Sequence, residues 1–301
     1  MSVAVLGAGG VGGLVAAALA RGSADVTVVA REPTAEHIAD HGLRLRSPLL
    51  GDLVARPAAT AELTEPARTL VVAVKAPLLE PALERVRADP EVVVPLLNGI
   101  EHIDLLRARF GTGRVAAGVI RVMSLRTAPG EIEHVSPDAR VDLAAADPVL
   151  RERLEPFARD LRRAGVEVRV GSDEAGVMWS KLARLCPLAL ATTAYDAPVG
   201  EIRSDPVRRA ELDEAVDEVA QIARAEGAAI DAGEARRELE SAPPQLSSSM
   251  RRDVAAGAEP ELDAIAGAVL RAGRRNGLSA PTVRGLAVRV ASRAGIQEPP
   301  A

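Results

Sequence analysis

Six residues near the N-terminus, Gly7-Ala8-Gly9-Gly10-Val11-Gly12, constrain the fold of this chain most strongly. They follow an apolar stretch typical of a buried strand and open an Ala-rich stretch typical of a helix. The glycines have G-x-G-x-x-G spacing. The first permits a tight turn, the second leaves room for a pyrophosphate, and the third lets the helix pack on the strand. Because a helix N-terminus favours an anion, the sequence predicts a dinucleotide-binding turn.

Apolar strands alternate with helical stretches through the first half of the chain. The runs 69–77 and 91–99 are apolar almost throughout, and each is followed by a helical stretch. Such strands predict a parallel sheet that helices cover on both faces. The pattern also predicts a strand at 24–32, further strands within 114–143, a helix at 148–164 and a strand at 166–172.

From about residue 174 the chain becomes rich in Ala, Leu, Arg and Glu, with helical periodicity in stretches such as 208–227 and 260–277. The pair Asn276-Gly277 is a helix stop signal. We therefore expect an α/β Rossmann-type domain with a parallel sheet over residues 1–170. An all-α domain that completes the substrate and catalytic site is expected over 171–301.

Composition limits the possible partners. Aromatic residues make up 1% of the chain and the net charge is −5, so stacking platforms and basic tracts for nucleic acid are absent from the sequence. No apolar run reaches the ~20 residues that cross a bilayer. The single cysteine, Cys186, rules out an intrachain disulfide and fits a reducing compartment. These features predict a cytoplasmic protein that acts on small molecules, with no membrane or nucleic-acid partner.

The tip of the second strand favours NADP(H) as the dinucleotide. NAD-binding units usually place an acid about 20 residues after the glycine motif, where it binds the ribose 2′-hydroxyl. Here the strand ends in Arg31, while Asp25 lies at its other end and Glu32 comes one residue late. A guanidinium suits a 2′-phosphate. The alternative is a solvated surface arginine.

Lysine is rare in this chain: of 37 basic residues, two are lysines, Lys75 and Lys181. Unlike arginine, lysine can lose its proton when it is desolvated, so position 181 is a candidate proton donor. Lys75 and Asn98 each follow a predicted buried strand, at the edge where α/β proteins bind ligands. The alternatives are a solvated lysine and an ordinary Asn-Gly turn.

With these residues assembled, the chain resembles the ketopantoate reductase family (2-dehydropantoate 2-reductases). The resemblance runs nearly end to end, through "VLGAGGVGG", "VKA", "LLNGI", "MWSKLA" and "SSMRRDVAAGAEPELDAIAG". It implies NADPH-dependent reduction of a 2-oxo acid, ketopantoate by default, as in pantothenate biosynthesis. It also implies a Rossmann domain, a helical domain and an active site in the cleft between them.

Positions matched to the family motifs suggest catalytic roles. The resemblance assigns Lys181 as proton donor, Asn98 to nicotinamide and substrate, and Ser249 to the substrate. A desolvated lysine can stabilise the negative charge that develops on a ketone oxygen and then give up its proton. Residues 247–249 are serines ahead of a helix, where hydroxyls and backbone N–H groups are suited to hold a carboxylate. The alternative is plain N-capping, or one serine for each role.

The resemblance also assigns cofactor contacts. Arg31 and Lys75 match basic residues at the adenosine end, and Glu261 matches an acid near the cofactor. Ser124 lies near a further cofactor contact.

The chain departs from the family in one region. Typical members carry asparagines four and eight residues after the lysine, where this chain has Leu185 and Ala189. A third family asparagine is replaced by Val199. Leu185 and Ala189 lie on the helix face that Lys181 borders, although Pro187 is expected to kink or end this helix. The substrate pocket is therefore predicted to be unusually apolar.

This departure leaves two alternatives to a ketopantoate reductase. One is a reductase of the same fold that acts on a more hydrophobic ketone or oxo acid. The other is an NADPH-binding sensor without catalysis, against which Lys181 argues because a sensor needs no proton donor.

Several further residues have mainly structural interpretations. His37 and His41 have i, i+4 spacing, but no third ligand is apparent and we predict no metal site. Cys186 is flanked by apolar residues, as a packing residue would be. Trp179 and Tyr195 line either the cleft or the core. A homodimer is compatible with this two-domain plan.

Overall fold

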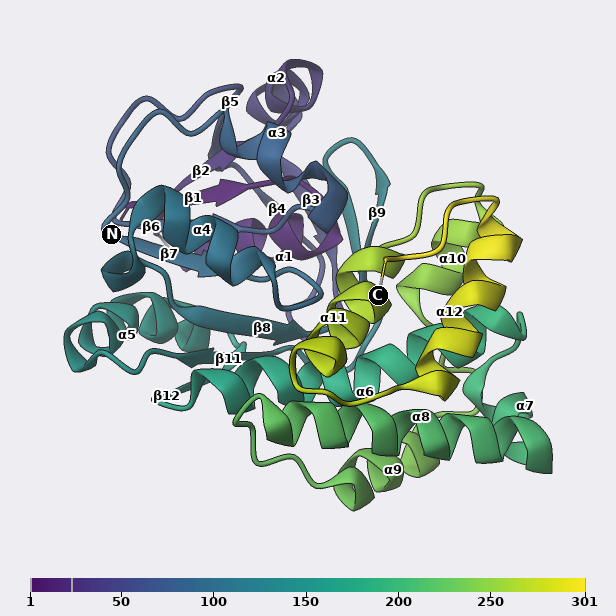
Figure 1. The fold of residues 1–301 in the computed structure, drawn as a ribbon. Coiled ribbons are helices and arrows are strands. Elements are labelled where there is room, and N and C mark those ends of the chain that lie inside the picture. Colours follow the sequence, from purple (N-terminus) through teal and green to yellow (C-terminus); the bar gives the residue numbers. More distant parts are fainter. Residues whose placement is uncertain (1, 23, 301) are drawn as a thin grey trace. The chain divides into compact units, whose positions relative to one another are not determined.

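The computed structural model describes residues 2–22 and 24–300. The chain divides into two compact units. The first comprises the residues up to Leu97 together with His102–Val177, and the second comprises Asn98–Glu101 together with the chain from Met178 onward. Figure 1 traces both along the sequence.

The centre of the first unit is a parallel sheet of five strands in the order β5-β2-β1-β6-β7. Neighbouring strands pair in parallel throughout, which confirms the predicted sheet. A bridge from Val93 to Val115 leads to a second sheet of order β12-β11-β8, in which β8 is antiparallel to β11. The strands are β1 (Ser2–Leu6), β2 (Asp25–Val29), β5 (Ala58–Thr60), β6 (Thr69–Val72), β7 (Val92–Pro95), β8 (Ala117–Arg121), β11 (Arg140–Ala144) and β12 (Glu167–Gly171).

Helices cover both faces of the parallel sheet because successive strand residues point to opposite sides. In β1, Val3 and Val5 belong to one buried cluster, whereas Ala4 and Leu6 belong to another. The first cluster includes residues of α1 (Gly10–Arg21) and α5 (Pro148–Arg163), and the second those of α3 (Leu79–Leu83) and α4 (His102–Phe110).

A smaller sheet of order β4-β3-β10-β9 packs near α1. The sequence predicted its later strands, β9 (Ser124–Ala128) and β10 (Glu131–His134), but not β3 (Leu43–Arg46) or β4 (Leu53–Ala55). A Cβ at Gly13 of α1 would lie 2.4 Å from the side chain of Ile132, so this glycine allows the close packing. Helix α2 (Glu32–His41) follows β2 and leads directly into β3 of this smaller sheet.

The second unit is built from helices, as the periodicity predicts. Residues 260–277 contain a π-helix, η3 (Asp263–Gly267), that runs into α11 (Ala268–Arg275), and α11 ends at Asn276 as expected. The other helices are α6 (Glu174–Ala194), α7 (Val199–Ser204), α8 (Pro206–Ala225), α9 (Ala232–Ser241), α10 (Ser249–Ala255) and α12 (Pro281–Ala294).

Helix α6 does not end at Pro187, which corrects one of the two outcomes expected there. Although proline removes a backbone donor, the helix continues to Ala194. Every residue from Cys186 to Thr193 is buried, so packing on all sides stabilises the turns around the proline. In the part of the chain that the structure describes, neither this helix nor any other is long and apolar enough to cross a membrane.

Candidate active site

The turn after β1 allows a ligand to approach the backbone closely. Gly7 has φ +105°, and a Cβ there would lie 2.8 Å from the carbonyl oxygen of Ala73. A Cβ at Gly12 would lie 1.9 Å from the carbonyl oxygen of Gly7, so α1 packs directly on the turn. At Gly9, by contrast, a Cβ would meet nothing within 4 Å. Since Gly9 also begins α1 without a side-chain cap, open space borders the first turn of the helix, as a nucleotide pyrophosphate requires.

Ser124 supports this turn from the smaller sheet. Its hydroxyl donates a 2.8 Å hydrogen bond to the carbonyl oxygen of Gly10. A Cβ at Gly10 would lie 2.2 Å from the Ser124 carbonyl oxygen, so the two backbones are in direct contact. The predicted cofactor contact at Ser124 therefore lies against the glycine turn itself.

Arg31 and Lys75 flank the turn along the carboxyl edge of the sheet. Arg31 follows β2 and Lys75 follows β6, the two strands that pair with β1. Both side chains are exposed. Asp25 lies at the opposite end of β2, where it pairs with Ser2. Within residues 2–22 and 24–300 the Arg31 guanidinium has no hydrogen bond or ion pair, so it is available to an anion.

Three predicted residues meet in the second unit. The Lys181 ammonium donates a 2.9 Å hydrogen bond to the Oδ1 of Asn98. The Nδ2 of Asn98 donates a 2.8 Å bond to the carboxylate of Glu261, which is 6% exposed. This carboxylate accepts hydrogen bonds and does not donate them, so it fixes the orientation of the amide and turns the Asn98 oxygen toward Lys181. The structure thus joins residues that lie 83 and 163 positions apart.

The segment that carries Asn98 is held against the π-helix. Gly99 has φ +83°, and a Cβ there would lie 2.3 Å from the carbonyl oxygen of Ala264. Arg271 of α11 donates two hydrogen bonds of 2.9 and 2.6 Å to the carboxylate of Glu101, and another of 2.7 Å to Asp263. These charge-assisted bonds raise the pKa of Arg271. Asn98 therefore projects from a rigid support, and π-helical turns frequently occur at functional sites.

The serines at 248 and 249 have different roles. The Ser248 hydroxyl caps α10 by accepting a hydrogen bond from the Arg251 backbone N–H, at 3.1 Å. It also lies 2.9 Å from the Thr192 hydroxyl, which donates its own proton to the Leu188 carbonyl oxygen. Ser248 is buried and fully engaged, whereas Ser249, the predicted substrate contact, is half-buried in the first turn.

The three aliphatic residues predicted to replace family amides differ in accessibility. Leu185 is half-buried, while Ala189 is 1% exposed. Val199 is fully buried in a hydrophobic cluster with Leu188 and Ile202. Of the three replacements, Leu185 is the one whose side chain a ligand can contact without a rearrangement of the core.

Residues with a structural interpretation are engaged in packing. Trp179 is 3% exposed, and burial raises the pKa of the Cys186 thiol, which makes it a poor nucleophile. The guanidinium groups of Arg208 and Arg289 lie 4.7 and 5.0 Å from the centre of the Tyr195 ring.

The two histidines predicted not to bind metal stack on each other in α2. The rings of His37 and His41 are 4.6 Å apart. Among the residues described, no group of three or more His, Cys, Asp or Glu is arranged to hold a metal ion.

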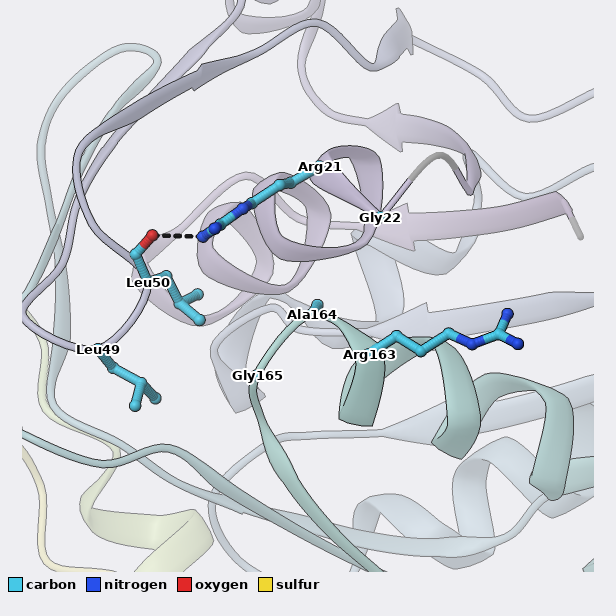
Figure 2. Close-up of a pocket in the computed structure, with 7 residues that line it drawn as sticks. All are labelled: Arg21, Gly22, Leu49, Leu50, Arg163, Ala164 and Gly165. Atoms are coloured by element: carbon cyan, nitrogen blue, oxygen red, sulfur yellow. Dashed lines mark hydrogen bonds between the residues drawn. The ribbon is translucent and has the colours of Figure 1, made fainter.

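A hollow of about 260 Å³ lies at the other end of α1, away from the glycine turn. It is lined by Arg21, Gly22, Leu49, Leu50 and residues 163–165. Figure 2 shows the Arg21 guanidinium bonded to the Leu50 carbonyl and the Arg163 side chain directed away. The Arg21 guanidinium at this hollow is therefore already bonded to the backbone of the chain itself.

Comparison with known proteins identifies the family of this chain. Residues 3–148 match the family described as ketopantoate reductase PanE/ApbA, and residues 174–294 match the ketopantoate reductase PanE/ApbA C-terminal family. The chain belongs to the ketopantoate reductase family. It is therefore an oxidoreductase with the nucleotide-binding fold of this reductase family.

Individual relatives of this ketopantoate reductase family member cover almost its whole length. It is 28% identical to 2-dehydropantoate 2-reductase of Halobacterium salinarum, over 98% of this chain and 100% of the relative. It is also 28% identical to the uncharacterized oxidoreductase YkpB of Bacillus subtilis, over 94% and 95%. The crystal structure of 2-dehydropantoate 2-reductase from Geobacter metallireducens superimposes with a TM-score of 0.88 at 28% identity. The superposition covers 97% of this chain and 99% of that chain.

A D-mandelate dehydrogenase in complex with NADH and anilino(oxo)acetate has the same fold. Its TM-score is 0.89 at 20% identity, over 98% of this chain and 99% of that chain.

Sequence reasoning did not identify the residues that support the Lys181–Asn98–Glu261 cluster. Glu101 and Arg271 are 170 positions apart, so no local pattern links them. Thr192 follows Ala189 by three residues, so it continues the face of α6 that carries Lys181 and Leu185. This spacing was a weak sequence signal that Thr192 lies near the site.

Proposed function

We propose that this protein reduces a 2-oxo acid to the corresponding 2-hydroxy acid with NADPH, and that Lys181 donates the proton. The observation that carries the proposal is the Lys181–Asn98–Glu261 chain of hydrogen bonds. It places an ammonium, one of two lysines in the sequence, beside an amide of fixed orientation.

The reaction needs a hydride at the carbonyl carbon and a proton at its oxygen. NADPH supplies the hydride when it is bound at the glycine turn. Negative charge then develops on the substrate oxygen, and the Lys181 ammonium stabilises it by a charge-assisted hydrogen bond before giving up a proton. Asn98 holds Lys181 in position. The Ser249 hydroxyl offers a further polar contact to the substrate.

Replacement of Lys181 tests this role. General acid catalysis contributes about 10²–10⁴-fold, so Lys181→Ala is expected to lower kcat by at least this range while NADPH binding stays unchanged. Lys181→Arg keeps the charge but cannot release a proton, so it should remain inactive. The matched control is Lys75→Ala, which should raise KM for NADPH and leave kcat unaltered. A wild-type protein that binds NADPH without any turnover would instead support the sensor alternative.

The preference for NADPH is proposed from Arg31. Its exposed guanidinium follows β2, and the acid of that strand, Asp25, lies at the far end. The D-mandelate dehydrogenase structures contain NADH, so the two coenzymes must be compared directly. Arg31→Ala should raise KM for NADPH about tenfold or more and leave KM for NADH nearly constant, as expected for loss of one charged hydrogen bond. Equal effects on both coenzymes would refute the assignment.

Ketopantoate is the first substrate to test, since several relatives are 2-dehydropantoate 2-reductases. Leu185 favours a second candidate, an oxo acid with a more hydrophobic substituent, because a family amide position is apolar and accessible here. The ratio of kcat/KM for ketopantoate and for 2-oxoisovalerate, which lacks the hydroxymethyl group, distinguishes the two.

A further inference from the structure

Arg252 is a half-buried arginine whose guanidinium makes no hydrogen bond or ion pair with any residue in the ranges that the structure describes. Its neighbour Arg251 behaves differently: its guanidinium donates to the Asp196 carboxylate at 2.9 Å and to the Asp196 carbonyl oxygen at 3.0 Å. Burial lowers the pKa of Arg252, and the charge of Asp253 opposes this shift only in part. A partly desolvated cation without a partner is unfavourable, and a bound anion would offset that cost.

The segment that carries Arg252 runs beside the Lys181 face of α6. Lys181, Leu185, Ala189 and Thr192 follow one another at i, i+4 and i, i+3 spacing, so they line one side of that helix. At one end, the Ser248 hydroxyl meets Thr192 at 2.9 Å.

At the other end, Glu261 is bonded to Asn98, which in turn accepts from Lys181. Residues 248–261 are therefore tied to both ends of this side of α6. Helix α10 lies within that segment.

Within α10, Ser249 and Arg252 share a face because they are three residues apart. Met250, which is 1% exposed, marks the face that packs into the core. At about 100° per residue, Arg252 lies on the opposite side of the helix from Met250. The guanidinium is thus presented on the same side as the hydroxyl of the predicted substrate contact.

We propose that Arg252 binds the carboxylate of the substrate beside Ser249 and makes this enzyme select anionic 2-oxo acids over neutral ketones. The inference rests on the proposed function, which it deepens with a specificity-determining residue. A guanidinium is suited to this role because its fork of N–H donors matches both oxygens of a carboxylate. Ser249 supplies a hydroxyl but no charge, so Arg252 is the element that distinguishes an acid from its ester.

The test compares 2-oxoisovalerate with its uncharged methyl ester in NADPH oxidation assays. Arg252→Gln should raise KM for the acid about 10- to 100-fold, the range expected for loss of a charge-assisted hydrogen bond, and leave kcat/KM for the ester within about twofold. Arg252→Lys should recover part of the loss, since it restores the charge without the fork. The matched control is Arg284→Gln, which removes an exposed arginine of α12. It should leave KM and kcat/KM unchanged for both the acid and the ester.

Three results would overturn the assignment of Arg252. The first is a KM for the acid that Arg252→Gln leaves unchanged. The second is an equal loss of kcat/KM for the acid and the ester. The third is a higher dissociation constant for NADPH while the preference for the acid over the ester stays the same. The last result would mean that the guanidinium serves a cofactor phosphate instead.

Calorimetric binding of 2-oxoisovalerate to the enzyme–NADP⁺ complex separates this inference from the proposed reaction. If wild-type protein binds the acid through Arg252 but does not oxidise NADPH, the reductase function fails and the carboxylate site stands. If wild-type and Arg252→Gln proteins reduce the acid equally well, the function stands and the carboxylate site fails. Absence of both turnover and binding overturns both.

Discussion

Replacement of Glu261 with glutamine would test whether the buried carboxylate orients Asn98 for catalysis. In the wild-type protein the carboxylate accepts a 2.8 Å hydrogen bond from the Nδ2 of Asn98. Glutamine has nearly the same shape but carries both a donor and an acceptor. If its N–H₂ faces Asn98, the amide of Asn98 must turn over, and its own N–H₂ then faces the Lys181 ammonium.

The size of the effect follows from the loss of charge at this bond. A hydrogen bond to a charged group contributes about 1.5–3 kcal/mol and a neutral one about 1 kcal/mol. The difference, about 0.5–2 kcal/mol, corresponds to a factor of about 2–30 in kcat/KM if Asn98 must hold its orientation in the transition state. Since Glu261 is 6% exposed, solvent screening reduces this figure little.

The measurement is a double-mutant cycle on kcat/KM with NADPH and a 2-oxo acid, using Asn98→Ala, Glu261→Gln and the pair. Because Glu261 is expected to act through Asn98, it should have little further effect once Asn98 is gone. Glu259→Gln, an exposed acid two residues earlier, is the control and should have no effect. Independent, additive losses would refute the idea that the carboxylate works by orienting the amide.

Three further outcomes are expected. Gly99→Ala should lower the free energy of unfolding in denaturant titrations by more than Gly277→Ala, since both sites have positive φ but only the first also meets a carbonyl oxygen; equal losses would contradict the clash. Leu185→Asn should raise kcat/KM for ketopantoate relative to 2-oxoisovalerate about tenfold, and an unchanged ratio would place Leu185 outside the substrate site. A hydrogen bond from Arg251 lowers the pKa of Asp196, so this carboxylate stabilises the fold above its unfolded pKa of about 4 and loses that effect as pH falls. Asp196→Asn should therefore lower Tm most at neutral pH, and this difference in Tm should shrink as pH falls below about 4; a difference that does not change with pH would exclude the ion pair as its cause.

Local pattern predicted most of the elements correctly because the features that specify them are local. The apolar strand before Gly7 and the glycine spacing fix β1, the turn and α1. The sequence pattern did not predict β3, which has four residues, or β4, which has three. Strands this short depend for their stability on pairing with each other and with β10. The pattern also suggested an end at Pro187, where burial of the flanking turns outweighs the lost hydrogen bond.

The sequence by itself determined the chemistry that this protein has available. Because two of the 37 basic residues are lysines, the sequence singled out Lys181 as a candidate proton donor. Leu185 stands where the family resemblance implies an amide, so it left the identity of the substrate open. Only the tertiary structure decided which groups act together, because hydrogen bonds such as Asn98–Glu261 join residues far apart in the chain. It also separated Arg251, bound to Asp196, from Arg252, which has no such partner in the described chain. That distinction depends on burial and on the distance to an opposite charge, and both are set by how the helices pack.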